Sequence, residues 1–374
     1  MILKTIKTEH TDEKTGLVLK RITTSEWETF NRKVAINNSM FSCEKKRLIY
    51  NKPLLSIPFQ IHHIPFKRKR QTWDFEGFDE SKAHAIKQKR LYLAFQQRSD
   101  KQWDSLTFTE AEGDFQDLAT RGLTFVPYSI PKDSTLETWK ERKKDALSIL
   151  NQSQMLVPVF CSKHDRKLFE EIFNYEFENS KLIGVQCYNI NDNDSFVNLM
   201  KIKLRNMRLQ TGDEAPLLFG LSYSKVQKSL SNVSGCFAYS CFGFDVLSHR
   251  QIFLENMPTE IVKKILSKRV EEIMRYDKVL GGYNLSAEQE FYDGINITQA
   301  FLENVAVAEG LTPYQAIQWA NFNEQQNDFD TLNDYVLETA DESNKDSALR
   351  FIESQKERWS VFWKTKMPQM AEVI

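Results

Sequence analysis

At 374 residues, with 41% hydrophobic and 27% charged residues, the chain has the length and composition of one large folded domain with appendages, which excludes a low-complexity polypeptide. The formal net charge is −1, so attraction to nucleic acid or to an acidic membrane must come from local patches. The five cysteines are scattered, without a CxxC pair or zinc spacing, so we expect reduced thiols, no metal site and no cofactor.

Membrane and export signals are not evident in the sequence. No apolar stretch approaches the roughly 20 residues that cross a bilayer. The first residues, "MILKTIKTEHTDEKTG", do not contain the long apolar core of a signal peptide. We therefore expect a cytoplasmic protein that does not associate with membranes.

Residues 1–52 are polar and mixed, and we treat them as an N-terminal extension without assigned structure. From residue 53, short apolar runs rich in β-branched and aromatic residues alternate with segments of helical period. In "DSTLETWKERKKDALSIL", Ser134 and Glu137 have the spacing of a capping box, and other helices are expected after Asp165, after Asp194 and over 224–233. The predicted strands are 54–62, 91–96, 124–130, 155–161, 182–190, 217–222 and 236–244.

This alternation predicts right-handed βαβ units around a parallel sheet that is covered on both faces. A closed barrel and a doubly wound sheet both satisfy it. Seven runs plus one hidden before residue 90 make eight strands, and no glycine-rich phosphate loop follows the first. The sequence therefore favours an α/β fold, a (β/α)8 TIM-type barrel over 53–255.

The strand pattern ends after residue 255, and the rest of the chain has helical period. We expect a C-terminal helical domain over 256–374, which could contact a protein partner. Its predicted helices are 259–276, 287–308, 313–322, 328–339 and 345–363.

Active sites of such barrels lie at the C-terminal ends of the strands. Asp245 is the only carboxylate that directly closes an apolar run, although it could also cap the next turn or pair with Arg250. The other polar strand ends are 60–63, 95–97, 128–129, 161–162, 186–189 and 222–223, together with Ser248 and His249.

The stretch from 216 to 250 resembles the last two strands of the tRNA-guanine transglycosylase barrel. "LLFGLS" is similar to that family's "YLMGVG", and "FDVLSHR" is similar to its "FDCVLPTR", which places Asp245 on the nucleophile. Upstream, "SIPFQIHHIPF", "LYLAFQQ", "LVPVFCSKHDRKLFEEIF" and "LIGVQCYNI" occupy the places of "TPVFMPVGT", "DSGGFQ", "IVQGG…LR" and "YAIGGLSVGE". The resemblance covers about 53–250.

The resemblance implies a pentosyltransferase that replaces guanine by a 7-deazaguanine in DNA or tRNA, with Asp245 attacking the anomeric carbon. The candidate base-binding residues at the strand ends are Cys161, Gly184, Gln186 and Ser222, together with Gln96, Tyr128 and His249, one of which, or a water, would have to stabilise the leaving guanine. The basic run Lys67, Arg68, Lys69 and Arg70, with Arg250, would contact phosphates.

The sequence also departs from the family. "LYLAFQQ" has no carboxylate for the general base, the acidic position near "FVPYSI" is absent, and there is no three-Cys, one-His zinc site. The alternative is therefore a catalytically degenerate barrel that serves as a nucleic-acid-binding or partner subunit. A phosphate-binding barrel enzyme acting on a small metabolite is a third hypothesis, which the missing glycine-rich loop disfavours.

Overall fold

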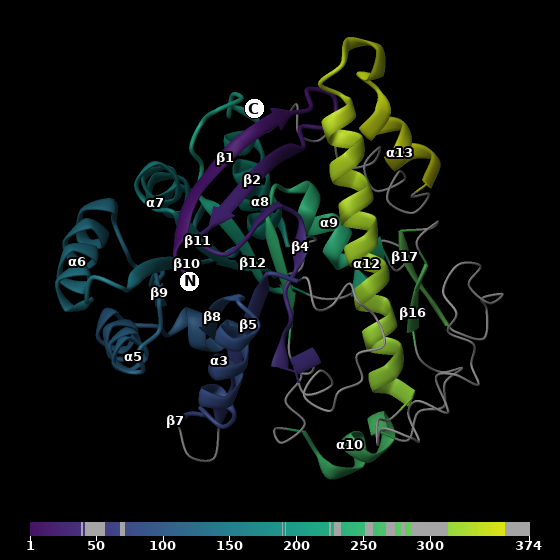
Figure 1. The fold of residues 1–374 in the computed structure, drawn as a ribbon. Helices are drawn as coiled ribbons and strands as arrows, with labels where there is room; N and C mark the ends of the chain where they lie inside the picture. The colour runs from purple at the N-terminus through teal and green to yellow at the C-terminus, as the bar shows by residue number, and fades with distance from the viewer. Residues whose placement is uncertain are drawn as a thin grey trace.

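A computed structural model describes residues 1–38, 40–41, 57–67, 72–188, 190, 192–223, 226–227, 233–250, 257–266, 274–277, 281–285 and 313–355. Its centre is an eight-stranded parallel sheet that curves into a nearly closed barrel (Figure 1). A bridge between Ile36 and Gln60 joins the two edge strands. In sheet order the strands are β4 (Lys33–Val34), β15 (Val246–His249), β12 (Leu217–Tyr223), β11 (Leu182–Gln186), β10 (Met155–Cys161), β9 (Phe125–Ser129), β8 (Leu91–Gln96) and β5 (Phe59–Ile64).

Amphipathic helices cover the outside of the barrel. They are α3 (Phe78–Lys87), α4 (Asp100–Asp104), α5 (Phe108–Thr120), α6 (Leu136–Ile149), α7 (Arg166–Asn179) and α8 (Asn193–Met207). α6 is the helix that the sequence predicts, but its capping box is formed by Thr135 and Thr138, and Ser134 donates to the Pro131 carbonyl.

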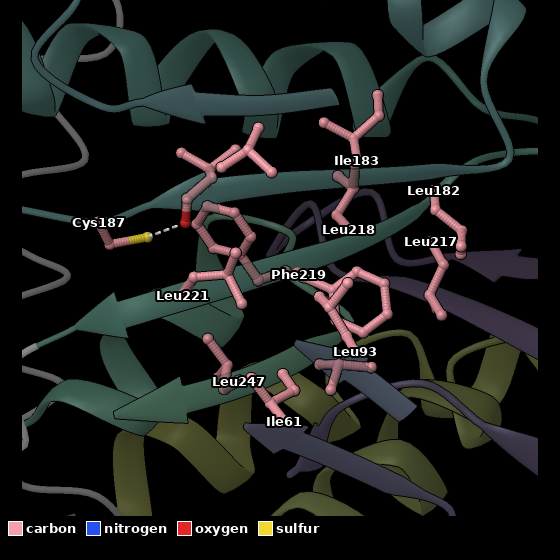
Figure 2. Packing of buried hydrophobic residues seen from close by; sticks show 14 of the residues in the cluster. Ile61, Leu93, Leu182, Ile183, Cys187, Leu217, Leu218, Phe219, Leu221 and Leu247 are labelled. Carbon is pink, nitrogen blue, oxygen red and sulfur yellow. Dashed lines mark hydrogen bonds between the residues drawn. The ribbon is translucent and has the colours of Figure 1, made fainter. Parts of the chain in front are cut away.

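Apolar side chains from both faces of the barrel strands form one buried cluster (Figure 2). Because successive side chains of a strand point to opposite faces, alternate positions fill the barrel interior and the others pack against the helices. The rings of Phe59 and Phe219 meet edge-to-face with centroids 6.4 Å apart. A Cβ at Gly184 would lie 3.0 Å from Leu221 Cδ1, so a side chain at that position would be crowded. The interior is thus a packed core, and a ligand has to bind at an end of the barrel.

The N-terminal region is structured, and the barrel begins earlier in the chain than residue 53. β1 (Leu3–Thr11), β2 (Val18–Thr24) and β3 (Glu28–Phe30) form an antiparallel sheet. β4 follows at Lys33 and is the strand that the sequence hides before residue 90. Two residues of ladder, extended by the Ile36 bridge, are too short to produce a recognisable apolar run.

The expected order of elements over 224–244 was wrong. The predicted helix 224–233 includes β13 (Val226–Gln227) and the first residue of β14 (Val233–Ser234), and the predicted strand 236–244 is mostly α9 (Gly235–Cys241). Every residue of α9 is buried, so it is apolar on all sides and its sequence has no helical period. A short apolar run of this kind cannot be separated from a buried strand by periodicity.

The C-terminal region is mixed, not purely helical. α10 (Thr259–Leu266) is shorter than predicted, and β16 (Met274–Asp277) and β17 (Gly282–Leu285) join β13 and β14 in an antiparallel four-stranded sheet. The predicted helices 313–322 and 328–339 are one helix, α12 (Pro313–Glu338), followed by α13 (Ser347–Gln355). The predicted helix 287–308 lies outside the described residues.

α12 runs alongside the barrel next to β4 (Figure 1). Its Gln326 Oε1 accepts a hydrogen bond from the Val34 backbone N–H at 2.9 Å, and Asn333 Oδ1 accepts one from Arg32 at 2.6 Å. These bonds attach α12 to the first barrel strand. None of the helices in the described ranges is both long and apolar enough to span a membrane.

Candidate functional site at the barrel mouth

Asp245 does not lie at the C-terminal end of a strand. It directly precedes β15, because the apolar run before it is α9, and it therefore lies at the N-terminal end of the barrel. The side chain is fully buried. We call the C-terminal end of the barrel its mouth. The expectation that Asp245 lies at this mouth was wrong.

The carboxylate of Asp245 accepts three hydrogen bonds from buried donors. Lys20 Nζ donates to Oδ2 at 2.9 Å, the Leu218 backbone N–H donates to Oδ2 at 2.8 Å, and Asn31 Nδ2 donates to Oδ1 at 2.8 Å. Burial lowers the pKa of Lys20 from its usual value, and the carboxylate opposes that shift. Asp245 thus joins the N-terminal sheet to the N-terminal end of the barrel. Its charged partner is Lys20 and not Arg250, which the sequence analysis considered.

At the opposite end, alternation along each strand decides which side chains face the barrel axis. His62 packs edge-to-face on Phe78 of α3, so it faces the helices, and His63 faces inward. The ring of Phe95 meets that of His63, so Gln97 is also an inward position and Gln96 faces outward. Gln96 Nε2 is buried without a partner in the structure.

The centre of the mouth holds a chain of three hydrogen-bonded side chains, from β15, from β5 and from the residue after β8. Ser248 Oγ lies 2.7 Å from His63 Nε2, and His63 Nδ1 lies 3.1 Å from Gln97 Oε1. The His63 main chain is held on both sides, since its N–H donates to Asn38 Oδ1 at 2.7 Å and its carbonyl accepts from Asn38 Nδ2 at 2.8 Å. Burial lowers the pKa of His63 to about 3, so the imidazole is neutral at pH 7.

Arg98 forms a second group beside this chain. Its backbone N–H donates to Gln186 Oε1 at 3.2 Å, and its carbonyl accepts from Gln186 Nε2 at 2.6 Å. The guanidinium pairs with Asp114 and lies 5.0 Å from the ring centre of Trp73 and 5.8 Å from that of Trp103. Arg98 therefore connects strands, helices and the rim of the mouth.

A pocket of about 330 Å³ opens at the ends of β10 and β11, next to α4. A volume of this order accommodates a small organic ligand. Trp103 Nε1 and both ring nitrogens of His164 are buried there without hydrogen-bond partners in the structure. The lining residues are Asp100, Trp103, Asp104, Lys132, Asp133, Cys161, Lys163, His164, Asp165 and Tyr188.

The pocket offers its ligand hydrogen bonds and an excess of negative charge. Four of its lining residues are aspartates and two are lysines, with Lys163 Nζ 2.9 Å from Asp100 Oδ2. Burial lowers the pKa of His164 to about 3 and raises that of the Cys161 thiol to about 12, so both groups are neutral at pH 7. The balance disfavours phosphate and suits a neutral ligand that carries N–H donors.

The residues implied by the resemblance have different positions. Cys161 lines the pocket, and Gln186 holds Arg98 and the Tyr188 hydroxyl at the mouth. Tyr128 packs between Phe115 and Trp139 in the helical layer, and Gly184 lies within the packed core, so neither is brought to the mouth.

Three further predicted residues lie at the ends of β12 and β15. Ser222 has a φ of +59°, a left-handed conformation that non-glycine residues seldom adopt. His249 is buried, with Asn37 Nδ2 3.0 Å from its Nδ1, whereas Arg250 is exposed. The two strands therefore present polar groups at the rim.

The basic run begins on a hairpin at this end of the barrel. β6 (Phe66–Lys67) follows β5 directly and pairs with β7 (Thr72–Trp73). Lys67 pairs with Asp74 at 2.7 Å, while Arg68, Lys69 and Arg70, which connect the two strands, lie outside the described residues. Trp73 donates to Asp114 Oδ1 at 2.8 Å, so the base of the hairpin is fixed beside Arg98.

Sequence reasoning identified the strand ends that carry His63, Gln97 and Ser248 but did not combine them. It included Tyr188 in the strand end 186–189 but missed Arg98, Trp103 and Lys163, which follow their strands by a few residues. Polar residues just beyond each strand were the available signal. A search of protein-family models and a search of curated proteins each find no match to this chain.

Proposed function

We propose that this chain is a transglycosylase-like barrel that binds nucleic acid across its C-terminal mouth, with a purine or 7-deazapurine base in the pocket beside α4, and that Asp245 forms no covalent intermediate. The observation that carries the proposal is the position of Asp245. Its carboxylate is buried against Lys20 at the other end of the barrel and cannot reach an anomeric carbon at the mouth.

The backbone at Ser222 supports the likeness to the transglycosylase barrel. In the alignment of "LLFGLS" with "YLMGVG", Ser222 takes the place of the final glycine. Its φ of +59° is a conformation that glycine adopts without strain. The left-handed backbone conformation at the end of this strand therefore explains why the family sequence has a glycine at the corresponding position.

The charges suit the phosphate and the base of a nucleotide in two different places, the basic run after β5 and the pocket beside α4. The hairpin run from Lys67 to Arg70 provides cations for phosphates, and it begins where β5 ends. The pocket provides carboxylates for the N–H groups of a base, and the Trp103 N–H for a ring acceptor. Trp73 at the base of the hairpin and Trp103 of the pocket contact the same Arg98 guanidinium.

The test is fluorescence anisotropy of labelled tRNA and of a short DNA duplex, measured over a salt series. We expect binding to one of them, with log K falling linearly with log salt concentration. Replacing Arg68, Lys69 and Arg70 by glutamine should make the slope of log K against log salt concentration shallower. For duplex DNA the change is about 0.9 for each phosphate that the chain no longer neutralises. A matched variant, in which the exposed Lys140 and Lys144 of α6 and Lys167 of α7 become glutamine, controls for net charge.

Thermal denaturation of the same proteins tests whether the pocket binds a purine or 7-deazapurine base. Guanine or 7-deazaguanine should raise the melting temperature of the wild type, and Trp103→Phe should remove that effect because the indole N–H is lost. An absence of binding to both nucleic acids contradicts the proposal. Aspartyl adduct formation that Asp245→Asn abolishes, in a variant that still folds, restores the enzymatic alternative.

A further inference from the structure

The Ser248, His63 and Gln97 side chains have the relative positions of a nucleophile, a general base and a group that orients the base. The two contacts are 2.7 Å from Ser248 Oγ to His63 Nε2 and 3.1 Å from His63 Nδ1 to Gln97 Oε1. Both lie in the range required of a catalytic relay. The three residues come from β15, from β5 and from just after β8, at the end of the barrel where active sites occur.

The hydrogen bonds fix the direction of proton transfer. Gln97 Oε1 can only accept, so His63 Nδ1 carries the ring proton and Nε2 holds a lone pair toward Ser248. The Ser248 hydroxyl therefore donates to Nε2, which is the arrangement that activates a serine. The two bonds to Asn38 fix the main chain of His63, from which the imidazole extends.

We propose that Ser248 is a nucleophile for acyl transfer from a small activated ester or amide, with His63 as its general base and Gln97 as the residue that positions His63. This activity goes beyond nucleic-acid binding and does not depend on it. Gln97 is the only member of the three that is partly exposed, so the relay meets solvent at that side chain.

The step conserves atoms and charge. Ser248 Oγ bonds to the carbonyl carbon while its proton passes to His63 Nε2, and the imidazolium then protonates the leaving alkoxide or amine as its bond to carbon breaks. Water reverses the sequence: it gives a proton to His63, attacks the acyl carbon and releases the carboxylic acid, and the proton returns to Ser248 Oγ.

The experiment is labelling of the full chain with a fluorophosphonate probe, in which the Ser248 Oγ–P bond forms and fluoride leaves with the proton. We expect one labelled serine, located at Ser248 by mass spectrometry, and no label in Ser248→Ala. His63→Gln should label at least about 100-fold more slowly, because general-base assistance is removed.

Ser162 provides a matched control. It is also fully buried, just after β10, but its Oγ lies 2.7 Å from Ser195 Oγ instead of from an imidazole. Ser162→Ala should label at the wild-type rate. Gln97→Glu separates positioning from packing, because a carboxylate stabilises the imidazolium and raises the pKa of His63.

Labelling of Gln97→Glu should therefore be faster than labelling of the wild type at pH 8. As the pH is lowered, the rate in Gln97→Glu should begin to fall at a higher pH, because in the wild type burial holds the pKa of His63 near 3. Circular dichroism of each variant confirms folding. If the folded wild type takes up no probe at Ser248, or if Ser162 labels equally, the proposal is overturned and the three side chains are a buried polar network.

Discussion

At the scale of single residues, the function of Asp245 is decided by its partners. Its run of apolar neighbours suggested a rim carboxylate, but its contacts are an ammonium, an amide and a backbone N–H, all buried. A buried ion pair of this kind is costly to break from one side, because the remaining charge has no solvent and no partner. Asp245 is thus expected to contribute to stability.

We predict that Asp245→Asn lowers the free energy of unfolding by about 3–5 kcal/mol, as measured by urea denaturation. The double variant Lys20→Met/Asp245→Leu should lose less than either single change, because it removes both charges together. An Asp245→Asn protein with an unchanged denaturation midpoint would show that the ion pair is not present.

At the scale of elements, the sequence predicted those whose pattern is local. β8 and β10 have the predicted bounds, and α6 and α7 were recognised from their apolar faces. The α/β fold class followed from this regular alternation, but the count of eight strands included the run 236–244, which is mostly α9, and did not include β15. β4 was hidden because it is a two-residue ladder that depends on its neighbours and on α12.

α9 and the candidate site show what a local pattern cannot contain. The helix is buried on every side, so its apolar run had no period to indicate a helix. Asp245 was therefore expected to follow a strand, whereas it precedes β15. Likewise, Ser248 and His63 are 185 residues apart in the chain, and only the closure of the sheet brings them together. Strand ends are predictable from sequence, whereas pairs across the mouth require the register.

At the scale of the whole molecule, three buried histidines make stability depend on pH. Burial lowers the pKa of His62 to about 4 and those of His63 and His164 to about 3. The unfolded chain takes up these protons near pH 6.5 and the folded chain does not, so stability is present above that pH and is lost as the pH falls toward the folded values.

We predict that each histidine adds a slope of up to about 1.4 kcal/mol per pH unit between roughly pH 6.5 and 4. Urea denaturation over this range measures the slope. His164→Phe, which removes a ring with no hydrogen-bond partner in the structure, should flatten it relative to the wild type. Equal slopes in the two proteins would mean that His164 titrates normally in the folded state.

We propose that nucleic acid binds at the C-terminal mouth and not at the end of the barrel that contains Asp245. Hydrogen exchange of the chain with and without bound tRNA or DNA distinguishes the two ends. We predict slower exchange in the β6–β7 hairpin, in α4 and at residues 161–165, with no change in β1 and β2. Protection confined to β1, β2 and the segment around Asp245 would show that nucleic acid binds at the opposite end of the barrel.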